Sequence, residues 1–153
     1  MTEVRRWPIS DAGPGDLDEL TEVFRRSSLS NAGDRELLLA HPEVLVLSVA
    51  DLATGRTRVA LDGDRIVGFA TTLAGDGALE LDALFVDPDR MREGVATALV
   101  ADAIAHARAL GIPAIEVTGN EHAMPFYRAA GFEAIGIMDT PLGVPALRLR
   151  RRA

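Results

Sequence analysis

The pattern of apolar and polar positions predicts a strand and then a helical region at the start of this chain. Val4–Ile9 is predicted as a strand, and a break rich in Gly and Pro follows it. Asp16 stands where a helix cap is expected. Apolar residues then recur at helical spacing, at Leu17, Leu20, Val23 and Phe24. After a second break, further helical stretches are predicted at Glu36–Ala40 and from Pro42 to near Gly55.

The next part of the chain predicts an antiparallel meander. Two apolar runs, Arg56–Leu61 and Arg65–Leu73, flank the turn Asp62-Gly63-Asp64. An Asp-Gly pair between such runs is a strong signal for a hairpin. A further turn at Gly75-Asp76-Gly77 leads into a strand over Leu79–Val86.

That last strand also begins a strand–helix–strand unit. A turn at Asp87-Pro88 follows it, and Met91–Ala96 opens a long helix that ends at Gly111. The buried stripe expected for this helix is Val95, Leu99, Ala103, Ala107 and Leu110. A strand over Ala114–Thr118 completes the unit, and such crossovers join parallel strands with right-handed geometry. Because the first N–H groups of a helix bind anions, the unit predicts a site for a phosphorylated ligand.

Two more strands are expected at the end of the chain, over Phe132–Met138 and Ala146–Leu149. The predicted fold is therefore α/β (α+β), with a mixed, mostly antiparallel sheet, one parallel strand pair and helices on both faces. Residues 1–153 are interpreted as a single domain, a length that can bury a core. The basic tail is interpreted as an edge strand that carries charges, with a solvated terminus. It comprises Arg148, Arg150, Arg151 and Arg152.

Composition narrows the function classes. The formal net charge is −7, which argues against a nucleic-acid partner because phosphate contacts need clustered Lys and Arg. The sequence has no Cys, which excludes a Cys nucleophile and Cys-ligated metals, and its three His residues are too scattered for a metal site. No apolar run reaches the roughly 20 residues of a membrane helix, and the N-terminus lacks the apolar stretch of a signal peptide. We therefore expect a soluble cytoplasmic protein with no metal and no membrane partner.

Several side chains near the predicted anion site could carry chemistry. Glu80 and Asp82 share one face of their strand, where a neighbouring carboxylate and partial burial would favour a general base; a solvated patch is the alternative. Tyr127 follows Phe126 on a short helix whose apolar face is predicted to be Ala123, Phe126 and Ala130. Considered alone, Tyr127 is more simply a core residue. In the same way, Asn120 alone indicates a turn, and His122 a surface side chain.

Taken together and in order, these residues resemble the GNAT N-acetyltransferases. The resemblance rests on Leu84-Phe85-Val86-Asp87-Pro88, Met91-x-x-Gly94-x-Ala96, Asn120 and Phe126-Tyr127-x-x-x-Gly131-Phe132. It implies the GNAT fold and an acetyl-CoA-dependent transfer of an acetyl group to a primary amine of a small molecule or peptide. Family members also often form homodimers.

The resemblance also implies roles for single residues. The backbone of the segment from Met91 through Arg92, Glu93, Gly94, Val95 and Ala96 to Thr97 would hold the pyrophosphate of acetyl-CoA. Leu84, Phe85 and Val86 would pair with its pantetheine arm, and Asn120 would contact that arm. Tyr127 would protonate the leaving thiolate, and Glu80 would act as the base, with Asp82, His122 or water as alternatives. A backbone N–H near Leu84 would stabilise the oxyanion.

Three positions depart from the family pattern. Met91 replaces Gln or Arg, Arg92 stands where Gly is common, and Glu93 stands where Lys or Arg is common. Glu93 is expected to repel the phosphates, with Arg90 and Arg92 offsetting it. Two rival functions are a non-catalytic acyl-CoA-binding or regulatory module and an acetyltransferase acting on charged tRNA. The presence of both Tyr127 and Glu80 argues against the first rival, and the net charge argues against the second.

Overall fold

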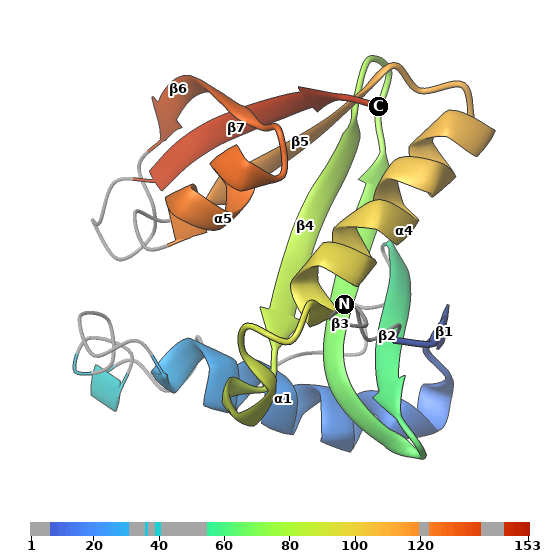
Figure 1. Ribbon diagram of the computed structural model, residues 1–153, viewed down its shortest axis with the longest axis vertical. Helices are drawn as coiled ribbons and strands as arrows, with labels where there is room; N and C mark the ends of the chain where they lie inside the picture. Colours follow the sequence, from blue (N-terminus) through green and yellow to red (C-terminus); the bar gives the residue numbers. More distant parts are fainter. Residues whose placement is uncertain (1–6, 31–35, 37–38, 41–54, 120–122, 139–145) are drawn as a thin grey trace, which may run out of the picture. The chain divides into compact units, whose positions relative to one another are not determined.

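A computed structural model describes residues 7–30, 36, 39–40, 55–119, 123–138 and 146–153 (Figure 1). Its strands form one seven-stranded sheet in the order β1-β2-β3-β4-β5-β7-β6. β4 (Leu79–Val86) runs parallel to β5 (Ala114–Gly119). β6 (Glu133–Met138) and β7 (Ala146–Arg152) pair antiparallel, and β7 also pairs antiparallel with β5. The mixed sheet with one parallel pair that the sequence predicts is therefore confirmed.

The chain forms two compact units. The first comprises Met1–Thr71 and Ala83–Asp102, and the second comprises Thr72–Asp82 and Ala103–Ala153. Three elements contribute residues to both units: β3, β4 and the long helix α4.

The first unit is built around a hairpin and a helix. β2 (Arg56–Asp62) and β3 (Arg65–Ala74) flank the turn at Gly63, whose φ is +61°. The hairpin that Asp62-Gly63 predicts is thereby confirmed. β1 (Ile9–Asp11) pairs antiparallel with β2, and α1 (Leu17–Leu29) lies against the hairpin (Figure 1). The core between α1 and the strands consists of Leu20, Val23, Val59, Ile66 and Phe69.

The opposite face of β3 receives the start of α4 (Val95–Ala109). A Cβ added to Gly68 would come within 2.7 Å of Val95 Cγ1 and 3.3 Å of Leu99 Cδ1. Gly68 therefore lets the helix approach the strand closely, and helices cover both faces of this part of the sheet.

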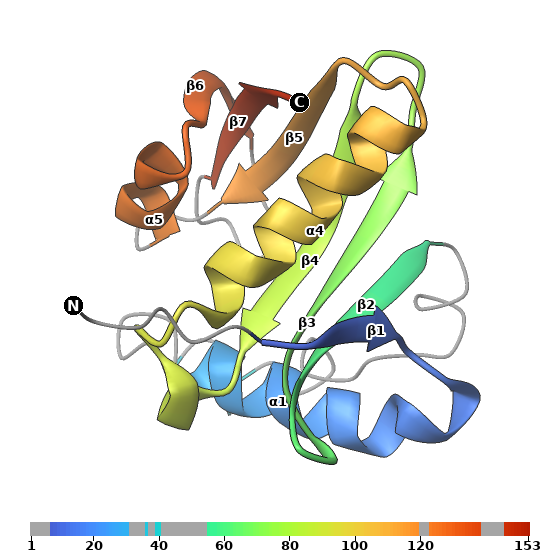
Figure 2. The ribbon, with the colours of Figure 1, turned by 45° about the vertical axis from the view of Figure 1, so that its right-hand side comes forward.

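The second unit carries α5 (Met124–Ala129) on one side of β5 and β7 (Figure 2). Pro125 lies in the first turn of this helix, where its missing N–H costs no helical hydrogen bond, as predicted. The buried side chains of α5 are Met124 and Tyr127. The apolar face predicted from Ala123, Phe126 and Ala130 is thus wrong, because the helix is rotated to bury the phenol.

Several predicted boundaries shift. Residues 4–6 of the expected first strand, Val4–Ile9, lie outside the described residues, and the strand itself is Ile9–Asp11. It begins after Pro8, which has no N–H to donate to the ladder. Asp16 occupies the cap position of α1, but its carboxylate accepts from the N–H of Gly13 at 2.7 Å. The helical stretches expected at Glu36–Ala40 and after Pro42 lie largely outside the described residues.

The connection between β4 and α4 contains a short 3-10 helix that the sequence did not predict, η3 (Pro88–Arg90). Another 3-10 helix, η1 (Pro14–Asp16), precedes α1. α4 begins at Val95 rather than at Met91, and it ends at Ala109. Its predicted stripe is buried at Val95, Leu99, Ala103 and Ala107. Leu110, however, is 51% exposed because it lies past the helix end, so its predicted burial is wrong.

The basic tail is not an edge strand. Arg148, Arg150, Arg151 and Arg152 all lie in β7, which is paired on both sides, by β5 and by β6. The edge of the sheet at this end is β6, where every residue is exposed. An inner strand can carry these arginines because their side chains remain partly or fully exposed to solvent.

Candidate functional site

The turn that precedes α4 has the backbone shape of an anion site. Arg92 has a φ of +64° and Gly94 a φ of +85°, so left-handed residues occur at two alternate positions. Such turns direct successive backbone N–H groups into one concavity. The carbonyl of Gly94 accepts the first helical hydrogen bond, from Ala98 N–H at 3.0 Å. The N–H groups of the first helical turn, which follow at once, have no intrahelical partners and favour a phosphate.

A distant tryptophan holds this turn in place. The buried indole of Trp7 donates from Nε1 to the carbonyl oxygen of Glu93 at 2.9 Å. The side chains of Met91, Arg92 and Glu93 are exposed, so this segment of the turn is anchored through its backbone. The sequence analysis did not single out Trp7, although a lone Trp beside a strand was a signal that could have identified it.

The charges beside the turn differ from expectation. Arg90 was expected to offset Glu93, but its Nη2 donates to Asp62 at 3.0 Å, and its Nε is buried without a partner. Arg90 is therefore engaged with the β2–β3 turn. Arg92 is exposed, and its expected role of balancing Glu93 stays a prediction.

A buried carboxylate fixes the end of β4 just before the turn. Asp87 is 1% exposed and accepts from Arg26 at 2.9 Å, from Arg65 at 3.3 Å and from the N–H of Asp89 at 2.9 Å. Arg26 also donates to Asp89 at 2.8 Å, and this hydrogen bond lowers the pKa of the Asp89 carboxyl. One carboxylate thus joins α1, β3 and η3. The sequence assigned Asp87 only to a turn.

The strand end expected to pair with pantetheine is packed by aromatic rings. Phe85 lies edge-on to Phe24, with ring centroids 4.7 Å apart, and 5.5 Å from the ring of Phe69. Leu84 and Phe85 are half-buried, and Val86 is buried. The cluster holds this segment of β4 rigidly, and its predicted contact with a ligand stays a prediction.

In the second unit, Tyr127 is set in an aromatic cluster. Its ring lies 5.2 Å from that of Phe126 and 5.4 Å from that of Phe132, and the residue is 5% exposed. Burial raises the pKa of Tyr127 to about 12. The phenol therefore keeps its proton throughout the neutral range and can serve as a proton donor. The core interpretation of Tyr127 is correct for its ring.

Gly119 determines where that ring lies. A Cβ added to Gly119 would come within 3.1 Å of Tyr127 Cε2 and 3.3 Å of Leu149 Cδ1. The ring occupies the space that a side chain on β5 would fill. Sequence reasoning missed Gly119 because its role is to leave space for a ring from another segment, which no local pattern shows.

Glu80 lies in a network of ion pairs. Arg148 donates to both of its carboxylate oxygens, at 2.6 and 2.9 Å, and also to Thr118 Oγ1 at 2.9 Å. Glu116 is 3.9 Å from the same guanidinium. The sequence predicted a second carboxylate, Asp82, as the neighbour of Glu80, but the closest partner of Glu80 in the structure is the cation Arg148.

Glu80 and Tyr127 lie on opposite faces of the sheet in this unit. Glu80 is in register with Glu116 of β5, so their side chains share a face. Tyr127 packs against Gly119, which is three positions further along β5 and so has the opposite orientation. We call the face with Glu80 and Glu116 the open face.

Two other candidate residues, Asn120 and His122, lie outside the described residues. Asp82 is exposed on β4. Within the part of the chain that the structure describes, no group of three His, Asp or Glu side chains could hold a metal ion. Among the described helices, none has the length and apolar character needed to cross a lipid bilayer.

Comparisons with known proteins bear on the family and the fold of this chain. The family model described as acetyltransferase (GNAT) family matches residues 17–132. No curated protein matches the sequence significantly. Among solved structures, a GCN5-related N-acetyltransferase from Rhodopseudomonas palustris is 17% identical, covers 100% of this chain and 99% of its own, and has a TM-score of 0.82.

Two further structures share the fold. PaiA N-acetyltransferase from Thermoplasma acidophilum, solved in complex with coenzyme A, is 17% identical over 97% of this chain and 100% of its own, with a TM-score of 0.74. The ribosomal-protein-S18-alanine N-acetyltransferase from Escherichia coli is 18% identical over 96% of this chain and 94% of its own, with a TM-score of 0.70. At these identities the likeness establishes the fold.

Proposed function

This chain belongs to the acetyltransferase (GNAT) family, and from that premise we propose that it transfers an acetyl group from acetyl-CoA directly to a primary amine of a small molecule or peptide. The observation that carries the proposal is the backbone of the turn before α4. Its left-handed residues, Arg92 and Gly94, and the helix N-terminus that follows match what a pyrophosphate requires. Proteins of this family use acetyl-CoA, and the Thermoplasma acidophilum structure holds coenzyme A.

The donor would be held by residues of three segments. The backbone from Met91 to Thr97 would bind the pyrophosphate, Leu84–Val86 would pair with the pantetheine arm, and Asn120 would contact that arm. Acetyl-CoA supplies the activated acetyl group. Since the contacts at the turn are made by backbone N–H groups, the side chains of Met91 and Glu93 need not take part.

Two side chains would move the protons. Glu80 would remove one from the acceptor amine, directly or through water, and Tyr127 would give one to the departing sulfur. Because the two side chains lie on opposite faces of the sheet, they would approach the reacting group from opposite sides. The phenol of Tyr127 is protonated at neutral pH, as a proton donor must be, and its raised pKa makes it a weaker acid than an exposed tyrosine. Arg148 would hold the carboxylate of Glu80 in one orientation through two hydrogen bonds. Asp82, His122 and water remain alternatives for the base.

One observation favours a second candidate, a non-catalytic acyl-CoA-binding module. Both carboxylate oxygens of Glu80 are occupied by Arg148, and the ring of Tyr127 is part of an aromatic cluster. Each residue thus has a structural role that a non-catalytic binding protein could also need. Both candidate functions predict that the protein binds acetyl-CoA, and only the enzyme predicts turnover.

The test therefore measures binding and turnover separately. Acetyl-CoA should raise the midpoint of thermal unfolding by ligand linkage, and Gly94→Glu should abolish that shift. Gly63→Glu is the matched control, because Gly63 also has a positive φ and open space around it. A thiol-release screen over amines, amino acids, peptides and antibiotics then measures turnover. Absence of any shift at millimolar acetyl-CoA would refute the proposal, and binding without turnover would favour the module.

A further inference from the structure

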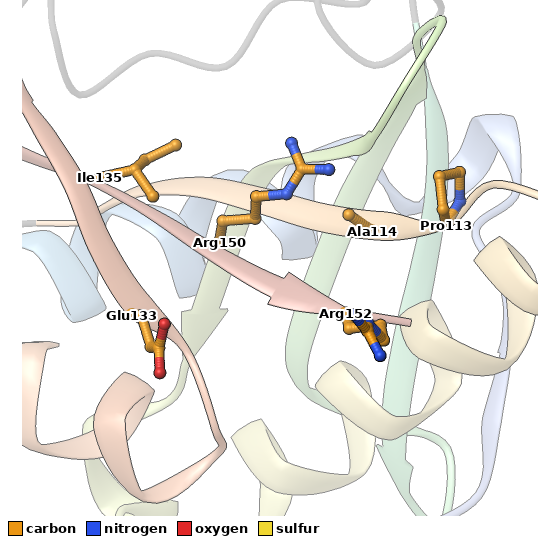
Figure 3. Close-up of a pocket in the computed structure, with 6 residues that line it drawn as sticks. All are labelled: Pro113, Ala114, Glu133, Ile135, Arg150 and Arg152. Atoms are coloured by element: carbon orange, nitrogen blue, oxygen red, sulfur yellow. The ribbon is translucent and has the colours of Figure 1, made fainter.

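A pocket of about 380 Å³ lies on the open face, one strand beyond Glu116. It is lined by Pro113, Ala114, Glu133, Ile135, Arg150 and Arg152. Figure 3 shows the residues of β6 on one side of the pocket and Pro113 on the other, with the two arginines projecting from β7. The strand register connects this pocket to the proposed base, because Glu80 pairs with Glu116, and Glu116 pairs with Arg150.

The pocket carries two guanidinium groups whose charge the described carboxylates neutralise only in part. Arg150 reaches its nearest carboxylate, Glu116, only at 3.8 Å, and its side chain is 48% exposed. Arg152 makes no ion pair with any described residue. Arg148 differs from both, since its guanidinium is already bound to Glu80 and Thr118. Two guanidinium groups are thus available to an anionic ligand.

We propose that this pocket binds a carboxylate of the acceptor, so that the substrate is an amine that carries a carboxylate about 10 Å away. This inference rests on the proposed function. The spacing follows from the register, because Glu80 and Arg150 are two strands apart and neighbouring strands lie about 4.8 Å from each other. A chain of about three extended residues spans that distance from its amino group to its carboxylate. The substrate class is a short peptide with a free C-terminus.

The lining also explains how such a ligand is oriented. Guanidinium groups bind carboxylates through paired hydrogen bonds, which fix both position and direction. Pro113 and Ile135 provide apolar contacts for the C-terminal side chain of the peptide. Glu133 is the opposing element, since its exposed carboxylate on the rim repels an anion. Removing the charge of an arginine should therefore weaken binding of the carboxylate, and removing the charge of Glu133 should strengthen it.

The test compares trialanine with its C-terminal amide as acceptors. Wild-type kcat/KM, measured by thiol release, should favour the acid at least tenfold. Arg150→Gln should bring the ratio of acid to amide close to one, and Glu133→Gln should raise it. Arg108→Gln is the control, since Arg108 is exposed on α4 and should leave the ratio unchanged. A ratio near one in the wild type would overturn the proposal.

A binding measurement separates this proposal from the proposed function. The side-chain NMR signals of Arg150 and Arg152 should shift when the free protein is titrated with trialanine, and should not shift with the amide. If they shift while no amine is acetylated, the carboxylate pocket stands and the acetyl-transfer proposal fails. If amines are acetylated and the arginine signals stay fixed with trialanine, the pocket proposal is wrong and the transfer proposal stands. Absence of both effects refutes both.

Discussion

The indole N–H of Trp7 and the carbonyl oxygen of Glu93 are joined by a hydrogen bond of 2.9 Å across 86 positions of the chain. The bond fixes the backbone of the turn from a residue that does not belong to it. Because the sequence contains a single Trp, tryptophan fluorescence reports on the surroundings of Trp7. Fluorescence is therefore expected to change when acetyl-CoA binds at the turn.

Replacing Trp7 with Phe should weaken the binding of acetyl-CoA. Phenylalanine keeps an aromatic ring, although a smaller one, and the carbonyl of Glu93 loses its donor, which costs about 1 kcal/mol, or roughly a fivefold rise in Kd. Calorimetric titration measures this, and kcat with saturating acetyl-CoA should stay near the wild-type value. A fall in unfolding free energy without any change in Kd would assign Trp7 to packing only.

Arg92→Gly should stabilise the protein. Arg92 has a φ of +64°, a conformation that costs any residue with a Cβ roughly 1–2 kcal/mol. Glycine avoids this cost, but it also makes the unfolded chain more flexible, which offsets part of the gain in stability. We expect a net gain of about 0.5–1 kcal/mol in urea unfolding with an unchanged slope. Arg108→Gly, within α4, is the matched control and should cost up to about 1 kcal/mol. Equal effects at the two positions would argue against strain at Arg92.

The pKa of Tyr127 can be measured directly, because it is the single tyrosine of the sequence. The ultraviolet absorbance of the phenolate should appear with a midpoint of about 12, compared with about 10 in the unfolded chain. A raised folded-state pKa means that the phenol's contribution to stability is complete below pH of about 10 and is lost as pH rises toward about 12. The loss should amount to about 3 kcal/mol, and Tyr127→Phe should remove it.

Tyr127→Phe also separates an enzyme from a binding module. The variant retains the aromatic packing and loses one proton donor. Turnover should fall by roughly 10- to 10³-fold, while the affinity for acetyl-CoA stays nearly constant. A variant that folds, binds and turns over like the wild type would remove Tyr127 from the mechanism.

Glu80→Gln tests the base. The substitution keeps the shape of the side chain and removes the carboxylate, so the rate should fall by roughly 10²-fold or more and the acidic limb of the pH–rate profile should move or vanish. The ion pair with Arg148 is lost as well. Arg148→Gln is therefore measured in parallel, because it removes the same ion pair and keeps the carboxylate of Glu80, and its fall in rate should be smaller than that of Glu80→Gln. Near-normal rates in Glu80→Gln would direct attention to Asp82 and His122.

The sequence predicted the order of elements well where local rules decide it. The Asp62-Gly63 turn, the helical spacing from Leu17 and the position of Pro125 each depend on a few adjacent residues, and each is confirmed. The sequence did not predict the order of the last two strands in the sheet. A row of arginines is typical of an edge strand, but β7 pairs with both β5 and β6 and is therefore an inner strand.

The sequence predicted which residues belong to the candidate site, but it did not predict which residues contact them. Tyr127 and Glu80 could be chosen from the chain, but Arg148 as the partner of Glu80 depends on strand register that no local pattern contains. Asp87 was read as part of a turn because its three partners come from separate segments. Gly119 was missed since its effect is the absence of a side chain.

Gly119 also offers a way to retune the protein without touching its reactive groups. A methyl group there would press on the phenol ring at 3.1 Å, a distance that the ring can relieve only by moving a few tenths of an ångström. Gly119→Ala would thus displace the hydroxyl of Tyr127 and leave its chemistry intact. If Tyr127 is the acid that we propose, substitutions at Gly119 would change the position of its hydroxyl in small steps during laboratory evolution toward bulkier acyl donors, whereas substitution of the tyrosine would remove the hydroxyl.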